Sequence, residues 1–358
     1  MRDFKNQLSE TTVATRPTIG LRRREFVESL ITATLGAVAF PLFARAQQRD
    51  KLPTIGFLGA STPSIWSAFV AAFLQRLREL GWIDGRNIAI EYRWAEGVEE
   101  RYAEFATEFV RRKVDIIVTS GTAPTLAVKH VTTEIPIVFA AAGDPVGTGL
   151  VASLARPGGN LTGLSNQQTD LAAKRLDLLS KLVPNLRRLA VMGNVHSPNV
   201  ILEMNEVQSA GSRFGMDVAK LEITKTEEII PGIESLRGRI DGLYVCTDPL
   251  VTMYRIRINT LALTEKLPTI YAFREYVQAG GLMSYGPNFP DLFRRAGNHV
   301  DKTDRVTRRN ALRRRKLRKK AWHNKPGQIR NARRHQCLVD SHQIFLDGLI
   351  ERTALATA

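Results

Sequence analysis

The amino-acid sequence predicts an α/β fold with two similar lobes, each built on a parallel β-sheet. Between residues 52 and 286, short apolar runs alternate with longer amphipathic runs, which is typical of strands joined by helical crossovers. The alternation starts again near residue 170 with the same order and spacing, as two copies of one open sheet would. Two lobes of this kind imply a cleft between them.

The first lobe is predicted from a buried strand at 54–59 and a helix at 65–80. Gly81 closes this helix, because glycine readily takes the left-handed conformation that ends helices. The other predicted elements of this lobe are strands at 87–92, 114–119, 136–139 and 160–163 and helices at 98–112 and 122–130.

The second lobe repeats the pattern. Gly215 ends a predicted helix in the same way as Gly81, and Pro231 lies near the start of another, where a missing N–H costs least. The predicted helices are 170–182, 200–214 and 227–237, and the predicted strands are 188–192, 216–221, 242–246, 267–271 and 281–285.

Residues 1–46 resemble an export signal. Three arginines at 22–24 precede an uncharged stretch at 29–44, which is followed by the small-residue pattern Ala44-Arg45-Ala46. The arginines are similar to a twin-arginine signal, and the apolar stretch is shorter than the roughly 20 residues that span a bilayer. We expect the signal to be cleaved and the mature chain to be soluble and periplasmic.

The formal charge of +16 is concentrated at the two ends of the chain. Residues 47–302 contain 29 Lys or Arg and 27 Asp or Glu, whereas residues 303–358 contain 15 and 4. A block of like charge with little apolar periodicity is typical of a disordered or polyanion-binding segment. A shifted reading frame after Lys302 also produces such an abrupt change, and we favour it over a new functional tail.

The cysteines and short motifs give little sign of catalysis. Cys246 lies in an apolar run and is predicted to be buried, and whether it meets Cys337 is left open by the sequence. The chain has no C-x-x-C, H-E-x-x-H, G-x-S-x-G or Walker A motif, and the glycines after residue 146 lack the third glycine of a dinucleotide loop. We therefore expect no enzyme, metal or cofactor.

Ligands of open α/β sheets bind beyond the carboxyl ends of the strands, where loops lead into helices. Two such loops pair hydroxyl groups with a helix start: Ser61 and Thr62 after the first strand, and Ser120, Gly121 and Thr122 after the third. Free N–H groups at a helix start attract an anionic group such as a carboxylate. The hydroxyls fit simple helix capping as well as they fit ligand contact.

Further candidates follow other strands. Asp144 and Asp248 each precede a proline at comparable points of the two lobes, and each can accept hydrogen bonds from a ligand ammonium or cap a turn. Asn194 and Ser197 follow the first strand of the second lobe. Tyr285 is placed either to contact a planar ligand or to pack at a hinge, because a Gly-Pro turn follows it.

Together with the export signal, four sequence runs carry a family resemblance: PTIGFL at 53–58, LGWIDGRN at 80–87, AGDPV at 142–146 and GGLMSYG at 280–286. They resemble the ABC-transporter substrate-binding proteins of the tryptophan/tyrosine-uptake-like type over residues 50–302. The basic segment from residue 303 departs from that family, whose members continue with another strand and an apolar helix.

The resemblance implies a type I periplasmic binding protein, in which two Rossmann-like lobes joined by a hinge close on a small solute. It implies an amino-acid-like or aromatic solute, an ABC permease as partner, a monomer, and no role in nucleic-acid binding. The predicted parts are a signal at 1–46, lobes at 47–164 and 165–286, a return segment at 287–302 and a tail at 303–358. The implied cleft residues are Ser61, Ser120, Thr122, Asp144, Asn194 and Asp248.

An exported enzyme on the same fold is the alternative function, and polyanion binding through the tail is another. The first requires catalytic groups that the motifs above do not supply. The second rests on the Arg/Lys clusters alone, since the tail has a single tryptophan for stacking on bases.

Overall fold

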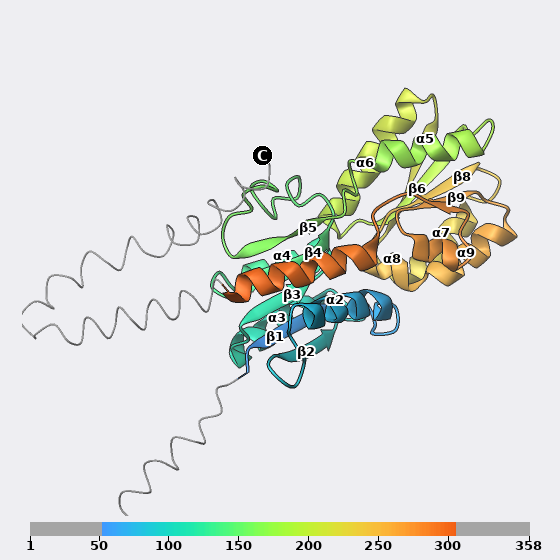
Figure 1. Ribbon diagram of the computed structural model, residues 1–358. Helices are drawn as coiled ribbons and strands as arrows, with labels where there is room; N and C mark the ends of the chain where they lie inside the picture. The colour runs from blue at the N-terminus through green and yellow to red at the C-terminus, as the bar shows by residue number, and fades with distance from the viewer. Residues whose placement is uncertain (1–51, 306–358) are drawn as a thin grey trace, which may run out of the picture. The chain divides into compact units, whose positions relative to one another are not determined.

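The computed structural model describes residues 52–305. The predicted export signal, Cys337 and nearly all of the basic segment lie outside these residues. Within the described part, the chain forms two five-stranded sheets in which every paired strand is parallel (Figure 1). The predicted α/β fold with two lobes is therefore confirmed.

The first sheet has the strand order β2-β1-β3-β4-β5. This is the 2-1-3-4-5 order of doubly wound sheets, whose ligands bind beside the first strand at the carboxyl edge. The elements are β1 (Thr54–Gly59), α2 (Ser67–Glu79), β2 (Ala89–Trp94), α3 (Glu100–Arg112), β3 (Ile116–Thr119), α4 (Thr122–Val131), β4 (Ile137–Ala142) and β5 (Leu161–Ser165).

Helices cover both faces of the first sheet. Successive residues of a strand point to opposite faces, and Phe57 of β1 packs against Phe73 of α2 with ring centroids 5.8 Å apart. Its neighbour Gly56 lies so close to Phe109 of α3 that a Cβ would be only 2.7 Å from that ring. A sheet buried on both sides explains why β1, β3 and β4 are continuous apolar runs.

The second sheet repeats the same topology, with the order β10-β9-β8-β6-β7. Its strands are β6 (Arg188–Asn194), β7 (Asp217–Ile223), β8 (Gly242–Val245), β9 (Thr269–Tyr271) and β10 (Met283–Ser284). Its helices are α5 (Ala172–Leu182), α6 (Pro198–Arg213), η1 (Thr226–Glu228), α7 (Ile229–Ser235), α8 (Pro249–Met253), α9 (Arg255–Thr264) and α10 (Arg274–Gln278).

Four helical segments are not predicted from the sequence: α8, α9, α10 and the helix at 289–305. On α9, the buried Ile258 is accompanied by Ile256 and Leu263, which are 61% and 74% exposed. The apolar residues of α9 thus lie on both its buried and its exposed faces. The 3.6-residue period that identifies amphipathic helices is therefore absent from its sequence. Cys246 is fully buried, as expected.

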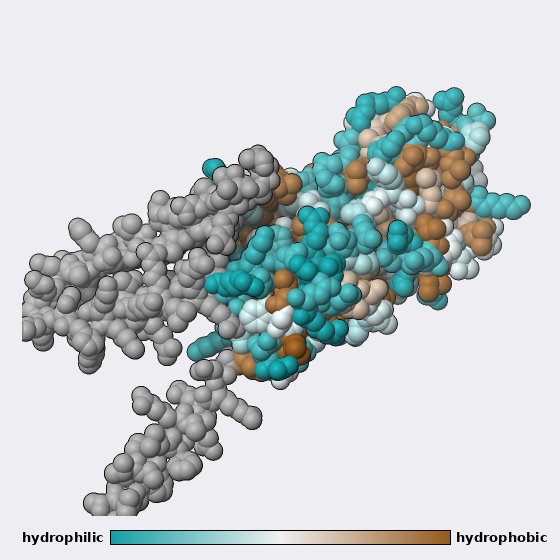
Figure 2. Space-filling view, in the orientation of Figure 1, coloured by the Kyte–Doolittle hydropathy of each residue, from teal (hydrophilic) through white to brown (hydrophobic). Residues whose placement is uncertain are grey.

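The helix at 289–305 returns to the first sheet's side of the molecule. Phe293 lies against Trp66 and Phe69 with ring centroids 5.5 and 5.4 Å away, and Arg76 Nε donates to Asn298 Oδ1 at 2.7 Å. Figure 2 shows a mainly hydrophilic outer face over this helix. The chain therefore passes between the sheets twice within residues 52–305, at 166–171 and at 285–288.

None of the helices described at residues 52–305 is both long enough and apolar enough to cross a membrane. No group of three or more His, Cys, Asp or Glu side chains in this range is placed to hold a metal ion.

Candidate functional site

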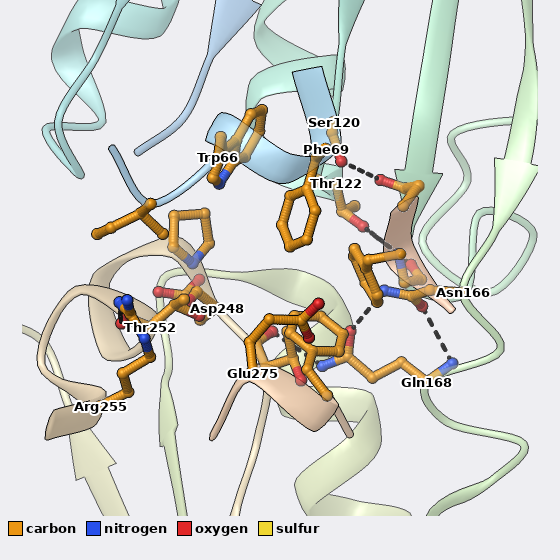
Figure 3. A pocket seen from close by; sticks show the side chains of 18 of the residues that line it. Trp66, Phe69, Ser120, Thr122, Asn166, Gln168, Asp248, Thr252, Arg255 and Glu275 are labelled. Atoms are coloured by element: carbon orange, nitrogen blue, oxygen red, sulfur yellow. Dashed lines mark hydrogen bonds between the residues drawn. The ribbon is translucent and has the colours of Figure 1, made fainter. Parts of the chain in front are cut away.

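A cavity of about 550 Å³ lies at the carboxyl ends of the strands, with residues of both sheets in its walls. This volume is within the range of small-molecule sites. In Figure 3 the side chains of the first-sheet part and those of the second-sheet part face one another across the cavity: Trp66, Phe69, Ser120 and Thr122 on one side, and Gln168, Asp248, Thr252, Arg255 and Glu275 on the other.

The first wall is built around the start of α4. Ser120 Oγ donates to the carbonyl of Ala141 at 3.2 Å, and Thr122 Oγ1 donates to the carbonyl of Gly143 at 2.9 Å. These hydroxyls therefore tie the loop after β3 to the loop after β4. The first N–H groups of α4 have no intrahelical partner, so the backbone at Thr122 and Ala123 presents donors and the positive end of the helix dipole to the cavity.

Gly121 makes this helix start possible. Its φ of 98° lies in a region that other residues rarely adopt, and a Cβ would come within 3.2 Å of Pro124. The glycine thus lets the chain turn sharply from β3 into α4, whose first residues line the cavity.

The second wall contains a buried carboxylate. Asp248 is 3% exposed and accepts hydrogen bonds from Ser197 Oγ at 2.6 Å, the Leu250 N–H at 2.9 Å and Asn194 Nδ2 at 3.2 Å. Burial raises its pKa above the usual value. All three donors are neutral, and no Lys, Arg or His side chain in residues 52–305 forms an ion pair with it.

Aromatic rings form the apolar part of the cavity. Phe69 of α2 packs on Phe289 and Phe293 with centroids 5.8 and 5.4 Å apart, and Trp66 and Phe273 complete the surface. Such rings supply apolar area for a planar or aromatic group at a low cost in conformational entropy.

Two charged side chains lie at another part of the wall. Arg255 Nη1 donates to the carbonyl of Thr252 at 3.2 Å. Glu275 is partly buried, and this burial raises its pKa. Both residues line the cavity. The lining is therefore polar around Arg255 and Glu275 and apolar where the aromatic rings lie.

Five of the ten predicted site residues line the cavity: Ser120, Gly121, Thr122, Ser197 and Asp248. Asn194 lies just behind the wall, where its amide donates to Asp248 Oδ1 and to Glu99 Oε1 at 3.2 Å each. It therefore supports the buried carboxylate without lining the cavity itself.

The other four predicted residues are not in the cavity lining. Ser61 is fully buried, and Thr62 Oγ1 shares a hydrogen bond with Ser64 Oγ at 3.0 Å. Tyr285 is 40% exposed, and its carbonyl accepts from Arg175 Nε at 2.7 Å. Tyr285 thus lies in the second crossover and outside the cavity lining.

Asp144 caps a turn. Its φ is 38°, and its Oδ1 accepts from the Gly147 N–H at 2.8 Å. A Cβ on Gly147 would lie 2.2 Å from the carboxylate, so the glycine is needed for this close approach. In the structure Asp144 therefore caps a turn, and its carboxylate accepts a hydrogen bond from the backbone of the same loop.

The sequence does not identify most of the aromatic and amide residues of the site. Trp66 and Phe69 have the pattern of ordinary core positions in an amphipathic helix, and Asn166 and Gln168 lie on a segment without a motif. The one available signal is position, because both amides follow closely after strand β5. The missed lining residues with polar or aromatic side chains are Trp66, Phe69, Asn166, Gln168, Thr252, Arg255, Gln278, Phe289 and Phe293.

The family model for the ABC transporter substrate-binding proteins matches residues 61–303. The chain belongs to this family. A tyrosine-binding protein from Clostridioides difficile is 31% identical over 225 residues, which are 63% of this chain and 65% of that protein. This family consists of solute-binding proteins and not of enzymes, and the resemblance inferred from the sequence is confirmed.

Solved structures agree on the fold. A Streptococcus pneumoniae ABC domain in complex with L-Trp has a TM-score of 0.67 at 22% identity, covering 71% of this chain and 85% of that one. A conserved domain protein from Vibrio cholerae has the same TM-score at 24% identity, covering 70% and 84%. The ligand-free, open structure of a Clostridium difficile substrate-binding protein with adhesive properties is 31% identical, with a TM-score of 0.51 and coverage of 70% and 84%.

Proposed function

We propose that this protein is the periplasmic solute-binding component of an ABC importer and that it captures a zwitterionic amino acid with an aromatic side chain. One observation carries the proposal: the cavity places a buried carboxylate without a cationic partner across from the free N–H groups of a helix start. These two features complement an ammonium and a carboxylate.

The solute's ammonium would pair with Asp248. A buried carboxylate held only by neutral donors is costly, because its charge is incompletely compensated. A ligand cation supplies the missing charge, so the same site that is unfavourable in the free protein binds the ammonium strongly. The solute's carboxylate would accept from the backbone at Thr122 and Ala123.

The aromatic wall supports an aromatic side chain for the solute. Trp66, Phe69 and Phe289 offer ring faces and edges that favour another ring by stacking or T-shaped contact. The names of two similar proteins point the same way, since one is a tyrosine-binding protein and another was solved with L-Trp.

Binding is proposed to proceed by closure of the two lobes about the crossovers at 166–171 and 285–288. Closure would bring the two walls together on the solute and remove both of its charged groups from water. The closed form would then be recognised by a permease of the inner membrane. The signal predicted at 1–46 supports export of the chain to the periplasm.

Calorimetric titration of purified residues 47–358 tests the proposal. We expect L-Trp, L-Tyr or L-Phe to bind, and an amine lacking the carboxylate or an acid lacking the ammonium to bind at least about 100-fold more weakly, since each loses one charged pair. Equal affinity for the amino acid and for the acid that lacks the ammonium would contradict the role of Asp248. Turnover of the bound solute would favour the enzyme alternative.

A further inference from the structure

The second-sheet part contains a fully buried ion pair. Arg175 Nη1 of α5 lies 2.8 Å from Glu203 Oε1 of α6, and the two side chains are 0% and 1% exposed. Tyr244 Oη of β8 joins them at 2.7 Å from each. Among the ion pairs of residues 52–305, this is the one with both partners buried.

Arg175 also binds the backbone of both crossovers. Its Nε donates to the carbonyl of Tyr285 at 2.7 Å, and its Nη1 donates to the carbonyl of Gln168 at 3.0 Å. The two crossovers are more than 100 residues apart in the sequence, yet one guanidinium holds both. The planar fork of arginine suits this task, because its donors have fixed relative directions.

Glu203 connects the same cluster to the cavity. It accepts a hydrogen bond from Gln168 Nε2, which also donates to the carbonyl of Thr247 at 3.0 Å. Gln168 Oε1 in turn accepts from Asn166 Nδ2 and Asn199 Nδ2 at 3.3 Å each. All three amide residues line the cavity, and Figure 3 labels Asn166 and Gln168. A continuous set of hydrogen bonds thus runs from the crossovers to the cavity wall.

We propose that Arg175 and Glu203 are positioning residues that fix the two crossovers relative to one another and hold Gln168 in the cavity wall, so that solute binding and crossover geometry are coupled. This inference rests on the proposed function. A purely stabilising role fits the pair poorly, because buried ion pairs replaced by apolar residues of similar volume often leave stability unchanged or increased. Such a replacement would, however, remove the hydrogen bonds that Arg175 donates to the carbonyls of Tyr285 and Gln168.

The double variant Arg175→Met with Glu203→Leu tests this, because it removes both charges together and leaves no unpaired buried ion. Its matched control is Arg213→Met with Glu206→Leu, which removes an exposed ion pair from the same helix α6. We expect both variants to give cooperative thermal unfolding. In the first variant we expect L-Trp affinity to fall roughly tenfold or more, while the control keeps wild-type affinity.

Hydrogen exchange gives a readout that needs no solute. In the wild-type protein the Gln168 N–H donates to Asn166 Oδ1 and the Tyr285 N–H donates to the carbonyl of Tyr271. We expect exchange at these crossover amides to be about tenfold faster in the first double variant than in the control, as local opening becomes easier. Unchanged exchange in the crossovers would overturn the inference, even where affinity falls.

A single Gln168→Leu variant separates the two halves of the proposal. It keeps the bond from Arg175 to the Tyr285 carbonyl, so we expect weaker L-Trp binding with wild-type exchange at 284–288. Unchanged affinity in this variant would overturn the link to the cavity. Absence of amino-acid binding by the wild-type protein would instead contradict the proposed function, and the exchange measurement would still decide the positioning role.

Discussion

Asp144 and Asp248 share a sequence context but have opposite surroundings. Each follows a strand and precedes a proline. Asp248 has extended backbone, with φ of −149°, and its buried carboxylate faces the cavity. Asp144 has a left-handed φ of 38° and uses its carboxylate to close the turn at Gly147. The same dipeptide therefore serves a candidate binding site in one lobe and a surface turn in the other.

The position of the preceding strand explains the difference. Asp248 follows β8, which lies next to the first strand of its sheet, whereas Asp144 follows β4, which lies one strand further out. In a 2-1-3-4-5 sheet the crevice opens beside the first strand, where neighbouring connections leave in opposite directions. The true counterpart of Asp248 in the first lobe is thus the loop at 120–122, and local sequence similarity is a weaker guide than strand order.

Replacing Asp248 should give the largest effect. In Asp248→Ala we expect the affinity for an aromatic amino acid to fall by about 100-fold or more, because truncating a buried charge partner typically costs 2–5 kcal/mol. Calorimetric titration measures this, and Asp248→Asn serves as the control for side-chain volume and should also bind weakly. Wild-type affinity in both variants would remove Asp248 from the site.

The pH dependence of binding sharpens the same point. Burial places the pKa of Asp248 above 3.8, so this group becomes protonated as pH falls through its raised pKa. Since the proposed ammonium needs the ionised form, affinity should decrease on acidification below that pKa, by up to about tenfold per pH unit. Asp248→Asn should lack this dependence. An equally steep decrease in that variant would assign the titration to another group.

Gly121→Ala tests the first wall. The φ of 98° at this position makes any side chain strained, and we expect a loss of roughly 1–3 kcal/mol in the free energy of unfolding together with weaker binding. Denaturant unfolding and titration measure the two effects. Gly149→Ala also has a positive φ, lies outside the cavity lining and serves as the control, with a similar loss of stability and unchanged affinity.

Asp144→Ala should have the smallest effect on binding. Because the carboxylate accepts from the Gly147 N–H, we expect a loss of about 0.5–1.5 kcal/mol in stability and an affinity within about twofold of wild type. Parallel thermal melts and titrations of the two alanine variants compare Asp144 directly with Asp248. A decrease in affinity equal to that of Asp248→Ala would restore Asp144 as a ligand contact.

Buried parallel strands are the part of the fold that the sequence predicts best. The runs at 54–59 and 188–192 are apolar and short, and their repetition predicts two similar sheets, because strands covered on both faces must be apolar throughout. Helix α9 and the helix at 289–305 are missed. On α9 apolar residues occur all round the helix, so no amphipathic period marks it.

The candidate site is predicted only where its chemistry is local. Gly121 and Thr122 can be recognised because a glycine followed by a hydroxyl residue marks a helix start. Asp248 can be recognised because it precedes a proline directly after a predicted strand. Trp66 and Gln168 cannot be recognised in this way, since their placement depends on how separate segments pack together. Asp144 shows the converse. Its Asp-Pro pair gives the same local signal as that of Asp248, but the strand that it follows places it outside the cavity lining.

The helix at 289–305 has a consequence for the order in which the protein folds. Its contacts with α2 join residues 222 positions apart, such as Arg76 and Asn298. While the chain is being synthesised, the aromatic face of α2 therefore stays uncovered until almost the last described residue is available. Contacts so distant in sequence form slowly and leave apolar surface exposed in the meantime. The first lobe to emerge is thus among the last parts to be completed.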